Sequence, residues 1–289
     1  MKEYLRKALR RETPFFVGIP AFIWLVLYFY VPLTFIVLLS FLLHDSASLL
    51  QGLTITHYLS FLTYPYVWIF LRSLFFAFTV SCACLCIGYS LAYFLAFKAG
   101  RFKTFFLFLV IIPFFTNFLL HIYAWFFVLE RNGFLNNLLQ FLGIIKEPLH
   151  FLNTAGATLV VMVYCYLPFM VLPLYSILEK FDRKLIESSL DLGATAWQTF
   201  TRITIPLTIS GIQSGFFLVF IPAFGEFVIP GLVGGDKSLF VGTVISTSML
   251  GAHTMADGAA FTVLTGVLLV VVAALLLCVI RSFERKGNV

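Results

Sequence analysis

One acidic residue follows a long uncharged and strongly apolar stretch of the sequence. Glu226 lies between Gly225 and Pro230, with Phe224 and Phe227 on either side. An ionised side chain costs about 2.5–3.5 kcal/mol at the centre of a membrane-spanning helix, so it usually faces a cavity or a partner. A carboxylate beside aromatic rings attracts an ammonium group. Glu226 is therefore a candidate for contact with a cationic solute.

Aromatic residues on two other apolar stretches could add further rings to such a cation site. They are Tyr123, Trp125, Tyr164 and Tyr166. Two structural roles for Glu226 stay open, because it could sit at the membrane interface or pair with Arg72 on another helix. Most of the remaining aromatic residues are expected to pack or to face lipid, since the chain has 36 Phe and 12 Tyr.

No motif for metal binding, nucleotide binding or catalysis is recognisable. The histidines show no metal-ligand spacing, and we assign them no function. The Cys82-x-Cys84-x-Cys86 run cannot converge on a metal from a helix, so these thiols are expected to pack. The chain contains no Gly-Lys dipeptide and hence no P-loop. We therefore expect a protein that is not an enzyme, with no ATP site, cofactor or metal of its own. The histidines are His44, His57, His121, His150 and His253.

The composition indicates that a membrane domain positions these residues. Of 289 residues, 61% are hydrophobic and 11% are charged, whereas a soluble domain carries about 25% charged residues. The apolar residues gather in six uncharged runs, each long enough for the roughly 20 residues that cross a bilayer. We predict an all-α membrane protein with spans at about 15–41, 70–97, 104–128, 156–178, 207–231 and 259–280.

The distribution of basic residues predicts the topology. If the N-terminus is cytoplasmic, 15 of the 19 basic residues lie in inside segments and four lie outside. The positive-inside rule then places both termini in the cytoplasm. The membrane domain would cover 14–280, with a basic N-terminus at 1–13 and a tail at 281–289. The net charge of +6 is explained by topology and does not indicate nucleic-acid binding.

Turn and helix signals predict two further features. The Asn132-Gly133 turn precedes apolar residues at helical spacing from Phe134 to Leu142, which predicts an amphipathic helix along the outer membrane face. Three prolines inside two predicted helical stretches should kink or break them, which membrane helices tolerate when neighbours satisfy the freed carbonyls. These prolines are Pro113, Pro168 and Pro173.

The longest inside loop, residues 183–206, carries the most specific pattern. Its charges recur at every fourth position from Arg183 to Asp191, which supports a helix. Gly193 can adopt a positive φ and turn the chain into a second short helix. Pro206 then starts the next span. The loop is therefore predicted to form a helix–turn–helix.

The role of this loop stays open from its residues alone. Either it exposes a large aromatic ring, Trp197 or Phe200, to a partner, or its apolar residues dip into the lipid interface.

A resemblance to a known family favours the first alternative. The spacing Glu187-x5-Gly193-x9-Ile203-x-Ile205-Pro206 resembles the EAA loop of binding-protein-dependent ABC permeases, with Ser188 and Ser189 in place of two alanines and Ile205 in place of leucine. The resemblance implies a coupling helix that seats on a separate cytoplasmic ATPase. The coupling-loop residues implied in this way are Glu187, Gly193, Ala194, Thr195, Trp197, Phe200 and Pro206.

Three further segments, Ile111–Trp125, Leu167–Asp182 and Ile221–Gly235, resemble the spermidine/putrescine permease branch of that family. The resemblance implies the fold of a type I ABC importer permease in the bacterial inner membrane and a polyamine substrate. The partners it implies are a second, homologous permease in a heterodimer, an ATPase dimer that holds ATP and Mg, and an extracytoplasmic polyamine-binding protein.

Two alternatives were weighed against this interpretation. Related permeases carry other small solutes such as iron, sulfate or thiamine on similar scaffolds. An ion-coupled secondary transporter would often show inverted repeats and intramembrane acids, and here Glu226 is the one candidate acid in the sequence. Dependence of transport on an ATPase partner separates the ABC permease from the secondary transporter.

Overall fold

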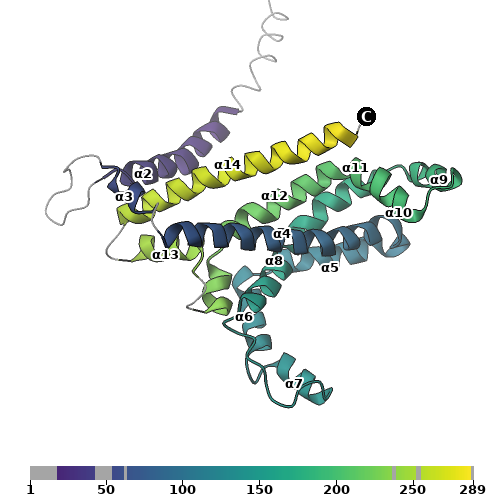
Figure 1. Ribbon diagram of the computed structural model, residues 1–289, viewed down its shortest axis with the longest axis horizontal. Coiled ribbons are helices and arrows are strands. Elements are labelled where there is room, and N and C mark those ends of the chain that lie inside the picture. Colours follow the sequence, from purple (N-terminus) through teal and green to yellow (C-terminus); the bar gives the residue numbers. More distant parts are fainter. Residues whose placement is uncertain (1–17, 43–53, 62–63, 236–238, 252–254, 288–289) are drawn as a thin grey trace, which may run out of the picture. The chain divides into compact units, whose positions relative to one another are not determined.

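The computed structural model describes residues 18–42, 54–61, 64–235, 239–251 and 255–287, and the regular elements in these ranges are helices (Figure 1). Four helices are long and apolar enough to cross a membrane: Gly18–Leu39, Tyr66–Phe97, Ala155–Glu179 and Met255–Arg281. Two bent pairs also qualify: Gly100–Phe115 with Phe118–Phe141, and Ala196–Leu207 with Ile209–Gly225. Counting each pair as one span gives six, as the sequence predicts. The basic segment 1–13 lies outside the described residues.

The chain divides into two compact units, of which the first comprises residues 1–63 and 247–266. Its described elements include η1 (Val26–Tyr30), α2 (Val31–Leu39), α3 (Thr56–Ser60) and the start of α14 (Met255–Gly287). The imidazole Nδ1 of His57 lies 2.6 Å from the carboxylate of Asp257. The rings of Phe61 and Phe261 lie 4.7 Å apart. A polar and an aromatic contact thus join α3 and the residue after it to α14.

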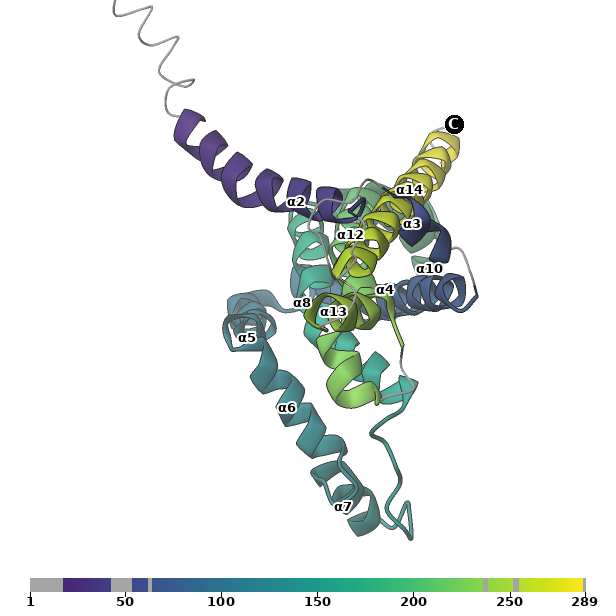
Figure 2. The same ribbon diagram turned by 90° about the vertical axis from the view of Figure 1, so that its left-hand side faces the viewer.

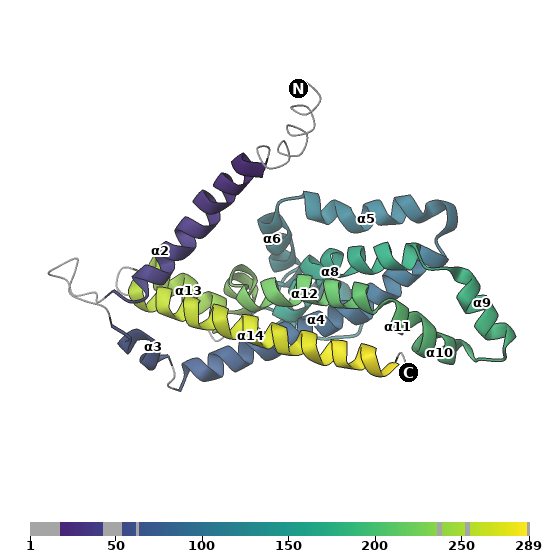
Figure 3. The same ribbon diagram turned by 90° about the horizontal axis from the view of Figure 1, so that it is seen from above.

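The second unit comprises residues 64–246 and 267–289. Its core is built by α4 (Tyr66–Phe97), α8 (Ala155–Glu179) and α12 (Ile209–Gly225), which lie alongside one another (Figure 3). Met170 is fully buried between them. A Cβ atom on Gly88 or on Gly215 would lie 2.8 Å from the Met170 side chain. Glycines at these two positions allow the close backbone approach on which helix association in lipid depends.

The third predicted span, 104–128, is two helices that meet at a sharp bend (Figure 2). The break lies between α5 (Lys103–Phe115) and α6 (Phe118–Leu129), and the bend between the segments Gly100–Phe115 and Phe118–Phe141 is 96°. Pro113 cannot donate a backbone hydrogen bond and crowds the preceding turn. Thr116 is then extended, and the Asn117 side chain caps α6 by accepting a hydrogen bond from the Leu119 N–H.

The three predicted proline breaks therefore differ in outcome. The span that contains Pro113 is broken a few residues after it, whereas α8 continues through Pro168 and Pro173. The fifth span is also bent, by 67°, between the short α11 (Ile205–Leu207) and α12. Helix α12 ends at Gly225, before the predicted end of this span at residue 231.

The predicted amphipathic helix after Asn132-Gly133 is present as α7 (Phe134–Phe141). Asn136 on this helix is fully buried. Its side-chain amide donates to the Leu149 carbonyl and accepts from the Leu149 N–H, both at 2.9 Å. The returning chain is thereby fastened to α7. The apolar side chains of Phe134 and Phe141 remain exposed.

Candidate functional site

The 183–206 segment forms the predicted helix–turn–helix. Helix α9 (Arg183–Asp191) is followed by Gly193 with φ of +85°, α10 (Ala196–Thr199) and the π-helical turn η3 (Phe200–Thr204). Thr195 and Gln198 form a capping box, in which each side chain bonds the backbone N–H of the other. This box satisfies two donors at the start of α10. The glycine provides the backbone conformation that separates the two helices.

A buried hydroxyl pair holds the two arms of the loop together. The Ser189 and Thr199 hydroxyl oxygens lie 2.6 Å apart, and both residues are buried. Ser189 occupies one of the two positions at which this chain differs from the alanines of the EAA pattern. The substitution therefore adds a hydrogen bond between α9 and α10 that an alanine cannot form.

The loop is attached to the ends of α4 and α8 (Figure 3). The Arg183 guanidinium donates to the Ala96 carbonyl at 2.7 Å and lies over the ring of Phe97. Lys103, at the start of α5, forms an ion pair of 2.5 Å with Glu179 at the end of α8. This ion pair joins α5 to α8 and does not involve the loop, so Arg183 is the residue of the two that attaches the loop to α4.

Phe200 packs inward, against α4. Its ring lies 5.5 Å from the ring of Tyr89 and 6.3 Å from that of Tyr93, edge to face in both cases. The Tyr89 hydroxyl lies 3.1 Å from that of Thr208, next to the start of α12. Phe200 is thus, with Arg183, a side chain through which the loop contacts α4 of the three-helix core.

Trp197 points outward and is 71% exposed. Leu192, beside the turn, is 88% exposed, and Leu185 and Leu190 are exposed as well. Of the two rings that the sequence left open, the exposed one is therefore Trp197. Exposed apolar side chains next to a short turn fit both roles left open from the sequence, contact with a partner and insertion into the lipid interface. Glu187, Thr195 and Pro206 are also exposed, and Ala194 is half-buried.

Glu226 lies just after the end of α12 and is 9% exposed. Its Oε1 accepts hydrogen bonds from the N–H groups of Val228 and Ile229, at 2.9 and 3.3 Å. Its Oε2 accepts one from the Tyr166 hydroxyl at 2.5 Å. The carboxylate thus caps the next helical turn, where backbone donors favour negative charge. Arg72 is not among these partners of the Glu226 carboxylate, and its guanidinium lies over the ring of Phe240, 5.3 Å from its centroid.

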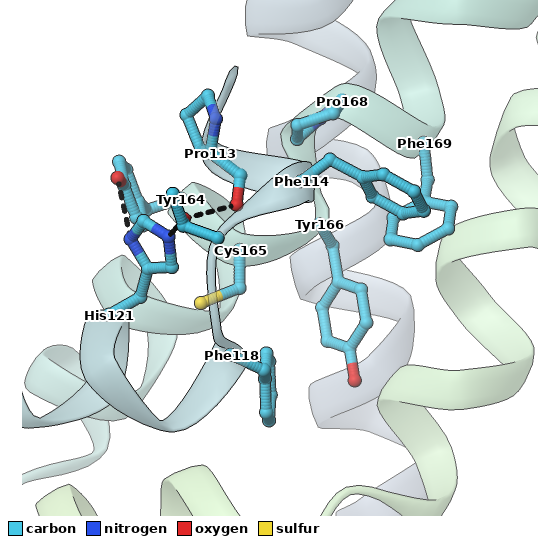
Figure 4. Close-up of a pocket in the computed structure, with 10 residues that line it drawn as sticks. Pro113, Phe114, Phe118, His121, Tyr164, Cys165, Tyr166, Pro168 and Phe169 are labelled. Carbon is cyan, nitrogen blue, oxygen red and sulfur yellow. Dashed lines mark hydrogen bonds between the residues drawn. The ribbon is translucent and has the colours of Figure 1, made fainter. Parts of the chain in front are cut away.

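A pocket of about 250 Å³ opens where α5 breaks into α6 (Figure 4). We call it the break pocket. Tyr164 and Tyr166, two of the predicted aromatic residues, line it. Trp125 stands behind Tyr164, with ring centroids 5.4 Å apart. Tyr123 is 49% exposed and is not part of the lining. The full lining is Pro113, Phe114, Thr116, Phe118, His121, Tyr164, Cys165, Tyr166, Pro168 and Phe169.

The sequence analysis missed the position of His121. Its Nδ1 lies 3.1 Å from the Tyr164 hydroxyl, and its Nε2 contacts the hydroxyl of Thr116. The sequence contains a signal that could have identified this residue, because His121 interrupts the apolar run from Phe118 to Trp125. An ionisable residue within a membrane-spanning segment is a candidate functional residue by default.

Comparisons with known proteins agree with this geometry. Residues 84–286 match the family described as "Binding-protein-dependent transport system inner membrane component". The chain is 42% identical to the spermidine/putrescine transport system permease protein PotB of Escherichia coli (strain K12), over 92% of this chain and 95% of that protein. The protein of the same description from Haemophilus influenzae is 36% identical, over 84% and 85% of the two chains.

Solved structures support the fold. A crystal structure of a bacterial ABC transporter that imports the polysaccharide alginate aligns with a TM-score of 0.66, at 19% identity, over 98% of this chain and 99% of the other. The alginate transporter in complex with its alginate-bound periplasmic protein aligns with a TM-score of 0.68, at 18% identity. The helical arrangement is therefore that of an ABC importer permease, and the chain belongs to the binding-protein-dependent transport system inner membrane component family.

Proposed function

We propose that this chain is the membrane permease subunit of an ATP-driven ABC importer that carries polyamines, spermidine or putrescine, across the bacterial inner membrane. The observation that carries the proposal is the 42% identity to a spermidine/putrescine permease over 92% of the chain. The aligned part is 92% of the chain and therefore includes both the loop and the pocket.

The proposed partners follow from the exposed surfaces and from the family. The loop around Trp197 is the contact for an ATPase dimer that binds ATP and Mg. A second, homologous permease completes the translocation path as a heterodimer. An extracytoplasmic polyamine-binding protein delivers the substrate, as a periplasmic protein accompanies the alginate transporter.

The proposed coupling runs from the ATPase through the loop into the core. Closure of the ATPase dimer displaces α9 and α10, whose arms are joined by the Ser189–Thr199 bond. Phe200 passes the displacement to α4 through Tyr89 and Tyr93. Rigid-body movement of packed helices then alternates access from one side of the membrane to the other.

The proposed substrate path includes Tyr164, Tyr166 and Glu226, with Trp125 supporting Tyr164 from behind. Aromatic faces attract ammonium groups, and Glu226 supplies a negative charge that Tyr166 holds in place. Tyr123 lies outside the break pocket. It could contact the substrate only if its exposed surface is covered by a partner subunit.

Uptake in cells that express the complete transport system tests the proposal. Deleting this chain should abolish uptake of radiolabelled spermidine and putrescine, and the wild-type chain should restore it. Unchanged polyamine uptake after deletion, in a strain with no other polyamine transporter, would exclude the proposed substrate. Uptake that persists when the ATPase is inactive would instead favour an ion-coupled transporter.

A further inference from the structure

The break pocket combines a broken membrane helix, a polar cluster and an aromatic wall. We propose that it is the site where one alkylammonium end of the transported polyamine binds. This inference rests on the proposed function and assigns a specific site to it. The pocket volume of about 250 Å³ is below the roughly 300–1,000 Å³ of sites that enclose a whole drug-sized ligand. It therefore suits one end of a long substrate rather than the entire molecule.

The polar side of the pocket is a directional chain of hydrogen bonds. The Thr116 hydroxyl donates to the Pro113 carbonyl at 2.8 Å, which uses its one proton. We therefore assign the proton between Thr116 and His121 to the imidazole Nε2, since hydrogen positions follow from the network. In the neutral ring Nδ1 then accepts from the Tyr164 hydroxyl.

This assignment leaves lone pairs of the Tyr164 oxygen available to an incoming donor. An ammonium group has three donors and no acceptor, so it matches this oxygen. The polar cluster is thus arranged to accept hydrogen bonds.

The rest of the pocket favours a cation with an apolar chain. Among the residues that the structure describes, its lining contains no Lys or Arg side chain to repel a positive charge, and no Asp or Glu. The rings of Phe114 and Phe169 pack 5.2 Å apart in this wall (Figure 4). Such faces attract an ammonium group and cover the methylene groups behind it.

Tyr166 connects this pocket to the carboxylate of Glu226. Its ring lines the pocket while its hydroxyl donates to Glu226 at 2.5 Å. A polyamine carries its ammonium groups a few methylene groups apart. If the first ammonium group donates a hydrogen bond to the Tyr164 oxygen, Tyr166 lies between that group and the Glu226 carboxylate. This carboxylate would bind the next ammonium group of the polyamine. The tyrosine is therefore the side chain that must move for the substrate to advance.

Cys165 lines the pocket and provides a direct reporter. The complete transporter, assembled with its partners in membranes, is treated with N-ethylmaleimide, and alkylation of each cysteine is followed by peptide mass spectrometry. Spermidine should slow alkylation of Cys165 by about threefold or more, as expected for a mostly occupied site. Cys86, which is exposed on α4, is the internal control and should react at an unchanged rate.

A matched pair of variants tests the Tyr164 oxygen. Tyr164→Phe keeps the ring and removes the acceptor, so it should lose the protection of Cys165 and lower uptake by roughly tenfold, as for a lost bond to a charged group. Tyr64→Phe makes the same chemical change at a residue that is 82% exposed. This variant should retain both the protection of Cys165 by spermidine and the rate of uptake. The amount of ATPase that copurifies shows whether each variant is assembled.

The outcomes separate this inference from the proposed function. If the wild-type complex takes up no polyamine, the proposed function fails. If it takes up polyamine while Cys165 stays unprotected and Tyr164→Phe is fully active, the break-pocket assignment alone fails. Phosphatidylethanolamine carries the same ammonium chemistry, so the assay is repeated in membranes without it. Protection that requires this lipid and not spermidine would overturn the assignment.

Discussion

The rings of Phe200 and Tyr89 stand nearly perpendicular, at 84°, with their centroids 5.5 Å apart. Phe200 belongs to the exposed loop and Tyr89 to the central helix α4. Trp197, three residues before Phe200 in the sequence, points away from the core. The rings of Trp197 and Phe200 lie 5.9 Å apart and face different surfaces, Trp197 the proposed ATPase and Phe200 the helices that must move, so we assign them different roles.

Substitution of each ring should therefore have a different effect. Trp197→Ala removes the exposed ring and should lower the amount of ATPase that copurifies with the complex. Phe200→Ala should leave that amount unchanged and lower uptake by roughly tenfold, since an aromatic pair contributes about 0.5–1.5 kcal/mol beyond its buried area. Copurification and uptake are measured on the same preparations. If both variants lose the ATPase equally, the division of roles is wrong.

Substitutions at Gly193 test the backbone turn between α9 and α10. At φ of +85°, a β-branched residue is strained by roughly 1–2 kcal/mol or more, whereas asparagine tolerates positive φ far better. Gly193→Val should therefore lower both ATPase copurification and uptake, and Gly193→Asn should keep most of each. No Cβ contact is present within 4 Å at this position, so crowding does not explain a difference. Equal activity of the two variants would contradict the role assigned to the turn.

Substitutions at Ser189 and Thr199 test the hydrogen bond between α9 and α10 of the loop. Ser189→Ala leaves the buried Thr199 hydroxyl without this partner and should destabilise the loop by about 1–3 kcal/mol. Proteolysis of the loop in membranes should accelerate accordingly. The double variant Ser189→Ala/Thr199→Val replaces both partners and should recover much of the loss. Ser188→Ala, at the exposed neighbouring position, should behave as wild type, and an equal effect there would refute the role of the bond.

Substitution of Glu226 tests the role of its negative charge beside the proposed substrate path. Glu226→Gln keeps an oxygen that can accept from the Val228 N–H and removes the negative charge, so assembly should be unchanged. Uptake should fall by about 10-fold or more, because hydrogen bonds to charged groups are worth about 1.5–3 kcal/mol. Glu130→Gln, at an exposed position, is the matched control. Full uptake by Glu226→Gln would assign this carboxylate to helix capping alone.

The sequence alone predicted the features that depend on local composition. Six apolar runs predicted the spans, and Gly193 with the charge spacing around it predicted the turn between α9 and α10. The helix at Phe134 followed from its periodicity. Each of these signals lies within one short segment, where hydrophobic spacing and backbone preference determine the structure.

Features that depend on contacts between distant segments were not predictable in this way. The partners of Glu226 include Tyr166, which lies 60 residues away, so its capping role required the fold. The break pocket likewise brings His121 to Tyr164, 43 residues apart. The sequence shows only that His121 is an ionisable residue in an apolar run. It does not show which residue accepts the proton of its imidazole Nε2.

Reconstitution of the complete transporter in proteoliposomes, with its second permease, ATPase and binding protein, tests whether this chain is a permease for polyamines. We expect ATP to drive accumulation of labelled spermidine or putrescine, and omission of this chain to abolish it. The Phe200→Ala complex should retain the ATPase but accumulate little substrate. Accumulation without this chain, or accumulation with this chain that needs no ATP, would exclude the proposed function.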